Sequence, residues 1–392
     1  MGLMAEITHK HCPKSRWAKR LLVKYWIEKR TQYLLPADVV AAAEADPARK
    51  RETVEMCRRK WEKTYAVLKR RSDALLNRAP CYAGRTDRDA LQTDMMFCFF
   101  AYGFQADEYL CYELEGRSEA ERRAFISDVD RFSFVYRYND IRDMQIFNNK
   151  IRTFEYLHDF YGREAIGIAD AGDYAAFEAF VTAHPVFVRK RAFESMGRSV
   201  EKMDYAASGL SMRAFFEKLL KDGPQILEEL VVQSAATAAL HPASVNTIRC
   251  ITFRTVHGVQ TPYCFMKIGQ KGSFIDNGGA GGILVGIDRE TGRLNTDGYD
   301  ELNRRYEKHP DTGIVFKGHQ LSDWEDLQPL CRKAAEVFPS VPYVGWDLAH
   351  TEQGWVLIEG NGMSQMIGPQ TVWKCGYKSE VEALLKDMKP FL

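Results

Sequence analysis

The sequence lacks any apolar run near the ~20 residues that a membrane-spanning helix requires. It also lacks a charged-then-apolar leader and any Cys-x-x-Cys pair. Its nine cysteines are scattered and odd in number, which favours reduced thiols over a disulfide framework. We therefore expect a cytoplasmic protein that neither spans a membrane nor depends on disulfides.

Two common nucleotide-binding signatures are also missing. The glycine-rich stretch 276–282 is not followed by Gly-Lys-Ser/Thr, which excludes a P-loop. A strand rather than a helix is predicted after it, which excludes the dinucleotide-binding fingerprint. The sequence has no internal repeat and no low-complexity segment. Any nucleotide site in this chain must therefore be built in another way.

The bulk composition is that of ordinary globular protein. The chain has 392 residues, of which 45% are hydrophobic and 27% charged, so it is long enough for two or three cores. The net charge is only +1, but residues 1–71 hold 18 Lys and Arg against 8 Asp and Glu. A basic N-terminal region therefore precedes an acidic body.

Two basic amphipathic helices are predicted in this N-terminal region. Apolar residues recur at helical spacing among lysines and arginines over 14–29 and again over 54–75. The simplest interpretation is a solvated basic face over a packed inner face, with no nucleic-acid partner. Peripheral contact with an anionic membrane, or a dimer surface, is the alternative.

The remainder of the chain divides into a helical and an α+β part. Ser118 and Glu121 form a capping box within an aromatic-rich helical stretch that runs to about residue 161. Beyond it the pattern predicts strands at 185–188, 226–232, 248–255, 261–268, 283–287 and 356–359, and helices at 175–183, 212–221 and 323–338. We therefore expect a basic helical region (1–78), a helical, aromatic-rich region (79–165) and an α+β catalytic region (166–392).

Three oxygen-bearing side chains near the C-terminus are predicted to meet on a β-hairpin. A three-residue loop, 352–354, with glycine at the position that favours positive φ, would place Asp347 opposite Glu359. Asn361, two residues on, shares the face of Glu359. Mg²⁺ takes oxygen ligands and usually only one or two protein carboxylates, with phosphates and waters completing its shell. The hairpin therefore has the ligands of a metal shared with a nucleotide; an ordinary solvated amphipathic hairpin is the alternative.

Other chemistry-bearing residues precede this hairpin. The four glycines in 276–282 free backbone amides to hold phosphate oxygens, although a plain hairpin connection also explains them. Lys190 ends the run PVFVRK and faces a short loop with Gly197, as a phosphate-binding lysine would. Glu228 and Glu229 lie inside an apolar strand, so they must reach solvent or accept hydrogen bonds from a ligand.

The order of these parts resembles the ATP-grasp superfamily. The phrases SVNTIR (244–249), IDNGGAGGI (275–283), HPDTG (309–313) and YVGWDLA…VLIEGN (343–361) are similar to the sugar-transfer-associated ATP-grasp family. The upstream stretch NNKIRTFEYLHDFYG resembles the lysine-containing segment that precedes the nucleotide clamp in such proteins. The likeness covers roughly residues 100–365.

The resemblance implies an α+β ATP-grasp fold, in which two α+β subdomains clamp a nucleotide, with a mostly helical N-terminal region. It implies that the nucleotide is bound by Lys150, Lys190, Gly197, Glu228, Glu229 and Leu230. It implies magnesium ligands at Asp347, Glu359 and Asn361, and catalytic roles for Arg249, Lys267 and Asn277. Relatives generally carry arginine where this chain has Lys267, so the charge is kept but the bidentate fork is lost.

The activity that the resemblance implies is an ADP-forming carboxylate–amine ligase that acts through an acyl phosphate. Its cofactors would be ATP and Mg²⁺, with Mn²⁺ able to substitute. The expected partners are a small-molecule or peptide substrate with a carboxylate, and an amine acceptor. Two alternatives stay open: a small-molecule kinase that uses the same site, and a non-catalytic nucleotide-binding adaptor.

Overall fold

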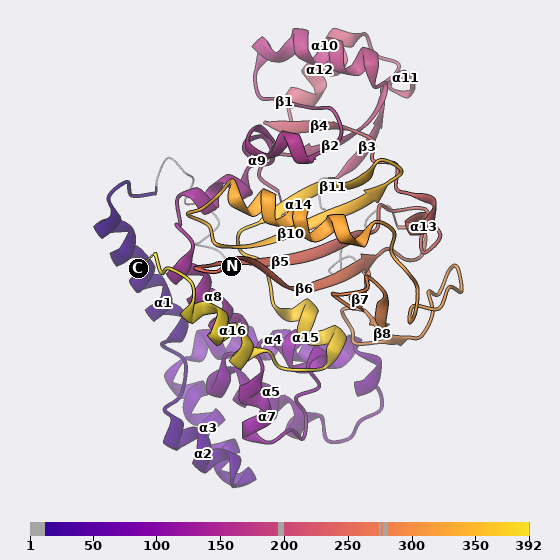
Figure 1. The fold of residues 1–392 in the computed structure, drawn as a ribbon. Helices are drawn as coiled ribbons and strands as arrows, with labels where there is room; N and C mark the ends of the chain where they lie inside the picture. Colours follow the sequence, from indigo (N-terminus) through magenta and orange to yellow (C-terminus); the bar gives the residue numbers. More distant parts are fainter. Residues whose placement is uncertain (1–11, 195–199, 274–275, 277–280, 392) are drawn as a thin grey trace.

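A computed structural model describes residues 12–194, 200–273, 276 and 281–391. Figure 1 shows a small sheet at one end of the molecule, a large sheet in the middle and a layer of helices at the other end. The chain passes from the helical layer to the small sheet and then to the large one. Both sheets are antiparallel throughout the described residues.

From residue 12 on, the N-terminal part consists of four helices: α1 (Arg16–Thr31), α2 (Ala37–Glu44), α3 (Pro47–Lys60) and α4 (Glu62–Arg78). Helix α1 begins after Ser15, whose side chain accepts a hydrogen bond from the Ala18 amide. The single helix predicted over 54–75 is wrong. Trp61 leaves the helical conformation with φ −132° and ψ 48° and separates α3 from α4, and its indole packs on the rings of Tyr33 and Phe100.

The aromatic-rich middle part is helical, as the pattern predicts. Its helices are α5 (Arg88–Tyr102), α6 (Ala106–Cys111), α7 (Glu119–Ala124), α8 (Asp128–Tyr138) and α9 (Lys150–Leu157). The capping box at Ser118 and Glu121 is confirmed as the start of α7. Short 3-10 turns occur at Pro80–Tyr82, Asp143–Asn148 and His158–Phe160. Helix α9 contacts β1 and β4 of the small sheet and β11 of the large one, so it lies between the sheets.

The small sheet has the strand order β1 (Ala165–Ile168), β4 (Gln225–Glu229), β2 (Val186–Arg191), β3 (Glu201–Asp204). Its core joins apolar side chains of β1, β2 and β4 to those of α10 (Tyr174–Ala183) and α12 (Met212–Leu220). A 3-10 turn (Ala171–Asp173) precedes α10, and α11 (Tyr205–Ser208) follows β3. The aromatic rings of Phe177, Phe187 and Phe215 fill the centre of this core.

The large sheet has the strand order β11 (Gly354–Asn361), β10 (Tyr343–Thr351), β5 (Thr247–Thr255), β6 (Gly258–Ile268), β7 (Ile283–Ile287), β8 (Leu294–Tyr299), β9 (Arg305–Tyr306). Every residue of β10 is buried, because the strand lies between β11 and β5 and both of its faces are covered. The strands predicted at 248–255, 261–268 and 283–287 are β5, β6 and β7.

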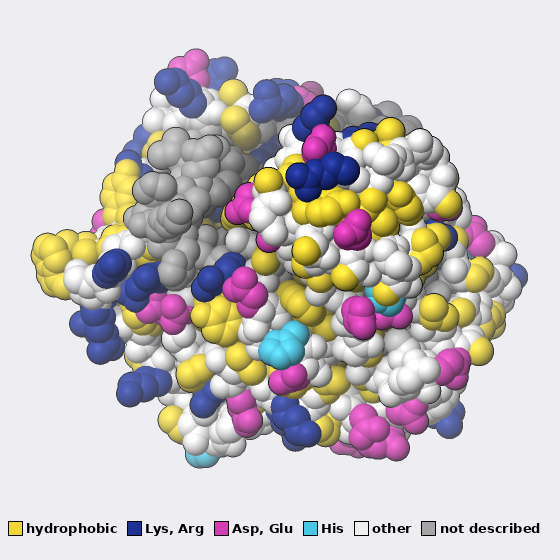
Figure 2. All heavy atoms as spheres, turned by 90° about the horizontal axis from the view of Figure 1, so that it is seen from above, with side chains coloured by type: hydrophobic (Ala, Val, Ile, Leu, Met, Phe, Trp, Pro, Cys, Tyr) yellow, Lys and Arg dark blue, Asp and Glu magenta, His cyan; other side chains and the backbone are white. Residues whose placement is uncertain are grey.

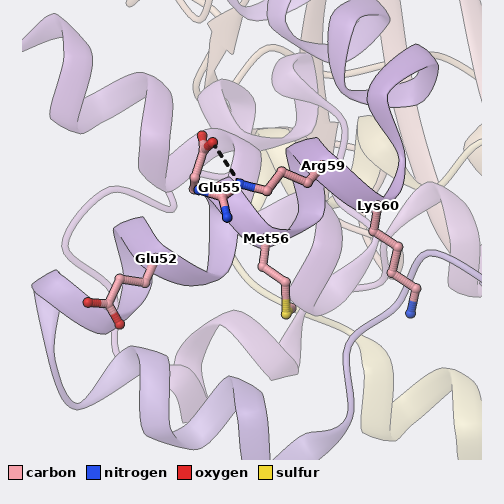
Figure 3. Close-up of a pocket in the computed structure, with 5 residues that line it drawn as sticks. All are labelled: Glu52, Glu55, Met56, Arg59 and Lys60. Atoms are coloured by element: carbon pink, nitrogen blue, oxygen red, sulfur yellow. Dashed lines mark hydrogen bonds and ion pairs between the residues drawn. The ribbon is translucent and has the colours of Figure 1, made fainter.

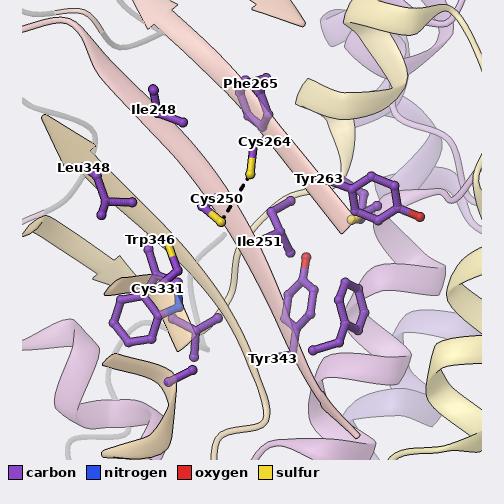
Figure 4. Close-up of a cluster of buried hydrophobic side chains, with 14 of the residues drawn as sticks. Ile248, Cys250, Ile251, Tyr263, Cys264, Phe265, Cys331, Tyr343, Trp346 and Leu348 are labelled. Carbon is purple, nitrogen blue, oxygen red and sulfur yellow. Dashed lines mark hydrogen bonds between the residues drawn. The ribbon is translucent and has the colours of Figure 1, made fainter. Parts of the chain in front are cut away.

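Helices cover both faces of this large sheet. Cys250 of β5 and Cys264 of β6 lie with their sulfur atoms 3.3 Å apart on the face toward Cys331 of α14 (Trp324–Glu336) (Figure 4). The next residue, Phe265, packs against α15 (Ile367–Trp373) on the other face. Helix α16 (Lys378–Lys386) packs against β5, and α13 (Ala235–Ala238) precedes that strand. All nine cysteines are free thiols.

The surface carries charges of both signs. Figure 2 shows Lys and Arg side chains interspersed with Asp and Glu over one face, in keeping with the net charge of +1. Among the described helices, none has the length and apolar character needed to cross a bilayer.

Candidate functional site

The hairpin of β10 and β11 places Asp347 opposite Glu359, which confirms the predicted pairing. The predicted loop is wrong, because Thr351 pairs with Gly354 rather than with Trp355, so the turn has two residues instead of three. A register shift next to Asp347 compensates for the missing residue. Gly354 has φ +106°, so the expected positive φ is present.

The compensating residue is Ile358. From the turn, the pairs run regularly to Leu348 opposite Leu357, and the next pair joins Asp347 to Glu359. Ile358 therefore has no residue opposite it, as in a β-bulge. The bulge turns Glu359 back to the position that a regular three-residue loop would have given it.

Asp347 is held by two cations of the neighbouring strands. The Arg249 guanidinium on β5 donates to both carboxylate oxygens, with Nε–Oδ1 at 2.6 Å and Nη2–Oδ2 at 2.7 Å. Lys267 Nζ on β6 lies 3.1 Å from Oδ2. Burial raises the pKa of Asp347, but Arg249 and Lys267 outweigh it and lower the pKa to about 2. We call these three residues the large-sheet triad.

Glu359 differs from Asp347 in having no partner. Its half-buried carboxylate makes no hydrogen bond or ion pair with any residue that the structure describes. Asn361 ends the same strand, and its Oδ1 accepts a hydrogen bond of 2.9 Å from the Met363 amide. The hairpin thus offers one free carboxylate beside one that is paired with cations.

A second buried carboxylate, Glu228 on β4, has the same arrangement in the small sheet. Lys190 Nζ on β2 lies 2.8 Å and 2.9 Å from its two oxygens. Arg163 donates to Oε2 through Nε at 3.0 Å and Nη2 at 2.5 Å. Burial raises the pKa of Glu228, but Arg163 and Lys190 together lower it to about 2. We call Glu228, Arg163 and Lys190 the small-sheet triad.

The expectation that Glu228 reaches solvent is wrong, because its side chain is buried and the chain itself supplies two cations for it. Arg163 is the residue that sequence reasoning missed. Its Nη1 donates to the carbonyl oxygens of Tyr161, at 2.9 Å, and of Leu357 on β11, at 2.8 Å. One guanidinium thus connects the small sheet to the large one. The only sequence signal was the rule that a buried acid needs a cation, which does not say which cation.

Lys150 stands between the two triads at the start of α9. Its amide donates to Ala192 O at 3.0 Å, and its ammonium group donates to the Glu194 carbonyl oxygen. Burial lowers the pKa of Lys150, with Glu359 raising it and Lys190 lowering it further. Residues of both sheets therefore act electrostatically on this one ammonium group.

The predicted hinge residues lie where the small sheet ends. Glu229 is the last residue of β4, its amide donates to Glu164 O at 2.9 Å, and its half-buried carboxylate accepts a hydrogen bond from the Glu164 amide at 3.2 Å. Leu230 follows, half-buried. Gly197 and Asn277 lie outside the described residues.

Asp276 anchors the start of the glycine-rich stretch. Its buried carboxylate accepts hydrogen bonds from the Thr247 amide at 2.9 Å and hydroxyl at 2.5 Å. Burial raises its pKa, while nearby Lys267 opposes this. Asp276 is therefore a second buried carboxyl group beside the large-sheet triad, in addition to Asp347, and no sequence pattern singled it out.

Two of the phrases that carry the family resemblance have structural roles. Asn246 Nδ2 donates to the carbonyl oxygens of Thr237 and His241, and its Oδ1 accepts from the Gly269 amide. His309 Nε2 bonds Gly269 O at 2.8 Å from the other side. These contacts hold the turn after β6, which ends at Ile268, one residue beyond Lys267.

A pocket of about 540 Å³ lies elsewhere on the described surface. It is lined by Glu52, Glu55, Met56, Arg59 and Lys60, all on α3 (Figure 3). Glu55 is already paired with Arg59 at 3.3 Å, and with Arg58. A pocket formed by a single helix holds no converging catalytic groups, so the two triads remain the candidate site.

The donor set fits a nucleotide-bound magnesium ion better than a metal site of its own. No group of three or more His, Cys, Asp or Glu side chains in the described parts of the chain is placed to hold a metal. Glu359 offers a free carboxylate, whereas Asp347 is paired with Arg249 and Lys267 and the Asn361 Oδ1 accepts from the Met363 amide. Mg²⁺ prefers oxygen ligands, and phosphate oxygens commonly complete such a shell. The cations of the two triads and Lys150 suit those phosphates.

A sequence model of a family described as sugar-transfer associated ATP-grasp matches residues 188–386. No curated protein matches the chain. The matched segment contains Lys190, Glu228 and all of the large sheet.

The chain is similar in fold to solved structures that include an ATP-grasp ligase and a D-alanyl-alanine synthetase. The ATP-grasp ligase PsnB, solved with its minimal precursor, Mg and ADP, is 13% identical; 67% of this chain and 66% of that one are covered, with a TM-score of 0.40. D-alanyl-alanine synthetase A from Vibrio cholerae is 10% identical; the match covers 63% of this chain and 67% of that one, with a TM-score of 0.40. This chain spans 64% of PsnB with the minimal precursor alone, slightly less than two thirds. TM-scores this low support no transfer of residue roles.

Proposed function

This chain belongs to the sugar-transfer associated ATP-grasp family, and from that premise we propose that it is an ATP- and Mg²⁺-dependent ligase that joins a carboxylate to an amine. The single observation that carries the proposal is the charge arrangement between the two sheets. Each triad holds two cations for one carboxylate, and Lys150 adds another cation beside the unpartnered Glu359. Such a site has an excess of positive charge and one free anionic ligand, as a magnesium polyphosphate requires.

In this proposal the small sheet binds the nucleotide. Lys150 and Lys190 contact phosphate oxygens, and Glu228 holds the Lys190 ammonium group in place through an ion pair. Gly197 is proposed to bind the nucleotide as well. Glu229 and Leu230, at the end of β4, form the adenine-side hinge, with the half-buried Glu229 carboxylate near the ribose.

The large sheet holds the metal and the reacting groups. Asp347, Glu359 and Asn361 would hold Mg²⁺, which when bound neutralises charge on the transferring phosphoryl group. Arg249 positions the substrate carboxylate or the acyl phosphate, since its guanidinium suits bidentate binding of a carboxylate, as its contact with Asp347 shows. Lys267 steadies the γ-phosphate as a point charge, and Asn277 assists from the glycine-rich stretch.

The reaction proceeds in two balanced steps. A carboxylate oxygen of the acid substrate attacks the γ-phosphorus, the bond from phosphorus to the bridging oxygen breaks, and ADP leaves with an acyl phosphate formed. An amine then attacks the acyl carbon, the carbon–oxygen bond to phosphate breaks, and the amine loses a proton as the amide forms. We propose a small molecule, peptide or sugar-polymer precursor as substrate, and the regions 1–78, 79–165 and 166–392 as the units of the chain.

The first experiment is calorimetric titration with a non-hydrolysable ATP analogue, with and without Mg²⁺. We expect magnesium-dependent binding that prefers adenine to guanine nucleotide. Glu359→Gln should abolish the magnesium dependence and lower any turnover at least about a hundredfold, because it removes a ligand charge and keeps the shape. Glu336→Gln, on the exposed end of α14, is the matched control and should behave as wild type. Magnesium-dependent binding that is unchanged in Glu359→Gln would refute the metal assignment.

A second experiment distinguishes the ligase from a kinase. Hydroxylamine intercepts an acyl phosphate and yields a hydroxamate from the acid substrate. Hydroxamate that appears only with ATP and a carboxylic acid supports the ligase. A stable phosphorylated product formed without any amine would favour the small-molecule kinase instead.

A further inference from the structure

Helix α1 presents an apolar stripe to solvent. Trp17, Leu21 and Tyr25 are 71%, 49% and 53% exposed. They are spaced four residues apart, so they lie on one face of the helix, one turn above another. Large apolar side chains exposed singly are ordinary, but three in a row on one helix face form a contact surface.

The opposite face of α1 is locked to the body of the protein. Val23 and Trp26 belong to the main core, and the Trp26 ring meets Tyr136 of α8 edge to face at 5.2 Å. Lys19 is buried in an ion pair with Asp140. The helix therefore cannot rotate to bury its stripe without breaking both of these contacts.

Cations border the stripe. Arg16, Arg20 and Lys24 are exposed on one side of it, and Lys29 on the other. The only acid of α1 is Glu28, which lies 3.9 Å from Lys24 and is offset by it. Figure 2 shows hydrophobic side chains projecting next to Lys and Arg on the side where α1 lies in Figure 1.

We propose that α1 docks this face on an anionic lipid surface. Trp17 and Tyr25 are rings that favour the interfacial zone, Leu21 inserts between them, and the bordering cations meet lipid head groups. This inference rests on α1 alone and does not depend on the proposed ligase activity.

A second copy of the chain fits this face less well than lipid does. Two such faces brought together would place the same cations against one another. Three side chains also give far less area than the roughly 800 Å² per partner of a stable interface. Figure 1 shows α1 at an outer edge of the molecule, apart from the small sheet at the top.

The test is co-sedimentation of the full chain with vesicles. We expect binding to phosphatidylcholine vesicles that contain about one third phosphatidylserine, and no binding to pure phosphatidylcholine. The triple variant Trp17→Ser, Leu21→Ser, Tyr25→Ser should weaken binding at least about tenfold. Arg20→Glu with Lys24→Glu should do the same at low salt. Thermal unfolding of each variant should match wild type, because all five side chains are exposed.

Met56→Ser is the matched control. Met56 is 45% exposed and stands among arginines on α3, so it shares the apolar and basic character of the stripe but not its position. It should bind vesicles as wild type does. Equal binding to neutral vesicles, binding unaffected by the triple variant, or no binding at all would overturn the proposal. So would a concentration-dependent dimer that disappears in the triple variant, because it would make a second copy the partner.

Discussion

Glu228 and Glu359 are acids of the same type in opposite electrostatic situations. Glu228 is buried between Arg163 and Lys190 and needs nothing further. Glu359 is half-buried and forms no ion pair with a described residue, although Lys150 and Arg249 interact with it electrostatically. A buried acid without a partner would be costly, so Glu359 is tolerable only where solvent or a bound cation reaches it. Mutation of Glu228 should therefore mainly lower the stability of the fold, whereas mutation of Glu359 should mainly weaken binding.

Lys190→Ala is predicted to weaken binding of the ATP analogue about tenfold, the value of one charge-assisted contact. Unfolding stability should fall modestly, because Glu228 keeps Arg163 as its partner. Calorimetric titration and thermal unfolding measure the two effects. Lys202→Ala, on the exposed neighbouring strand β3, is the control. Unchanged nucleotide affinity would show that Lys190 does not bind phosphate.

Acid should destabilise the protein through Asp347. Its pKa is about 2 in the folded state, below the roughly 3.9 of an unfolded chain, so its stabilisation is present above pH ~4 and lost as the pH falls toward 2. A contribution of about 2 to 3 kcal/mol follows from that difference. The free energy of unfolding, measured with urea, should be lower for Asp347→Asn than for wild type at pH 7. It should also depend less on pH between 5 and 3. Exposed Asp159→Asn should keep the wild-type dependence.

At the scale of single elements, the hairpin pairs Asp347 with Glu359 as predicted, but through a two-residue turn and a bulge instead of the predicted three-residue loop. The sequence signals a turn at Gly354, and positive φ there is present. It does not signal whether the turn has two or three residues, since a bulge at Ile358 gives the same pair of acids. Turn length and register are set by side-chain packing, which a local pattern does not contain.

Gly354→Ala is predicted to lower the free energy of unfolding by about 1 to 2 kcal/mol. The loss comes from φ +106°, which an L-residue rarely adopts. A steric clash is not the cause, since no atom lies within 4 Å of the new methyl position. Urea unfolding measures the loss. Gln353→Ala, the preceding turn residue with an exposed side chain, is the control and should stay near wild type. An equal loss in both variants would locate the cause in the turn side chains.

Periodicity predicted long amphipathic elements better than their ends. Strands β5, β6 and β7 appear where apolar runs predict them, and β4 ends at Glu229 rather than at residue 232. The break between α3 and α4 was not predicted, because Trp61 fits the apolar pattern of one continuous helix. Short strands such as β1 and β9 pair across long sequence separations, and nothing local marks them.

At the scale of the whole molecule, Arg163 joins the two sheets that border the candidate site. Its guanidinium binds Glu228 in the small sheet and the carbonyl oxygen of Leu357 in the large one. The motifs of the sequence predicted two subdomains and the order of their parts. They could not predict this joint, because its partners lie 65 and 194 residues away from Arg163.

Arg163→Lys should loosen the small sheet without unfolding it. A lysine keeps one charge near Glu228 but cannot reach two carbonyl oxygens as well. Amide hydrogen exchange in β1 and β4 should accelerate at least about tenfold, with that of β5 and β6 unchanged. Arg213→Lys, in an exposed pair with Glu217 on α12, is the control. Uniform acceleration in both sheets would mean that Arg163 supports the whole fold instead of the joint.

Because of the bulge at Ile358, the length of the turn and the pairing of the two acids do not depend on each other, as they would in a regular hairpin. The turn at 352–353 can gain a residue if the strand loses its unpaired one, and Asp347 still faces Glu359. A family of such chains can therefore vary in hairpin length at its tip while the spacing of its acids stays constant. A sequence alignment that allows no gap inside β11 will misalign one end of this strand. We expect related chains with an insertion in the turn to carry a compensating deletion in the strand.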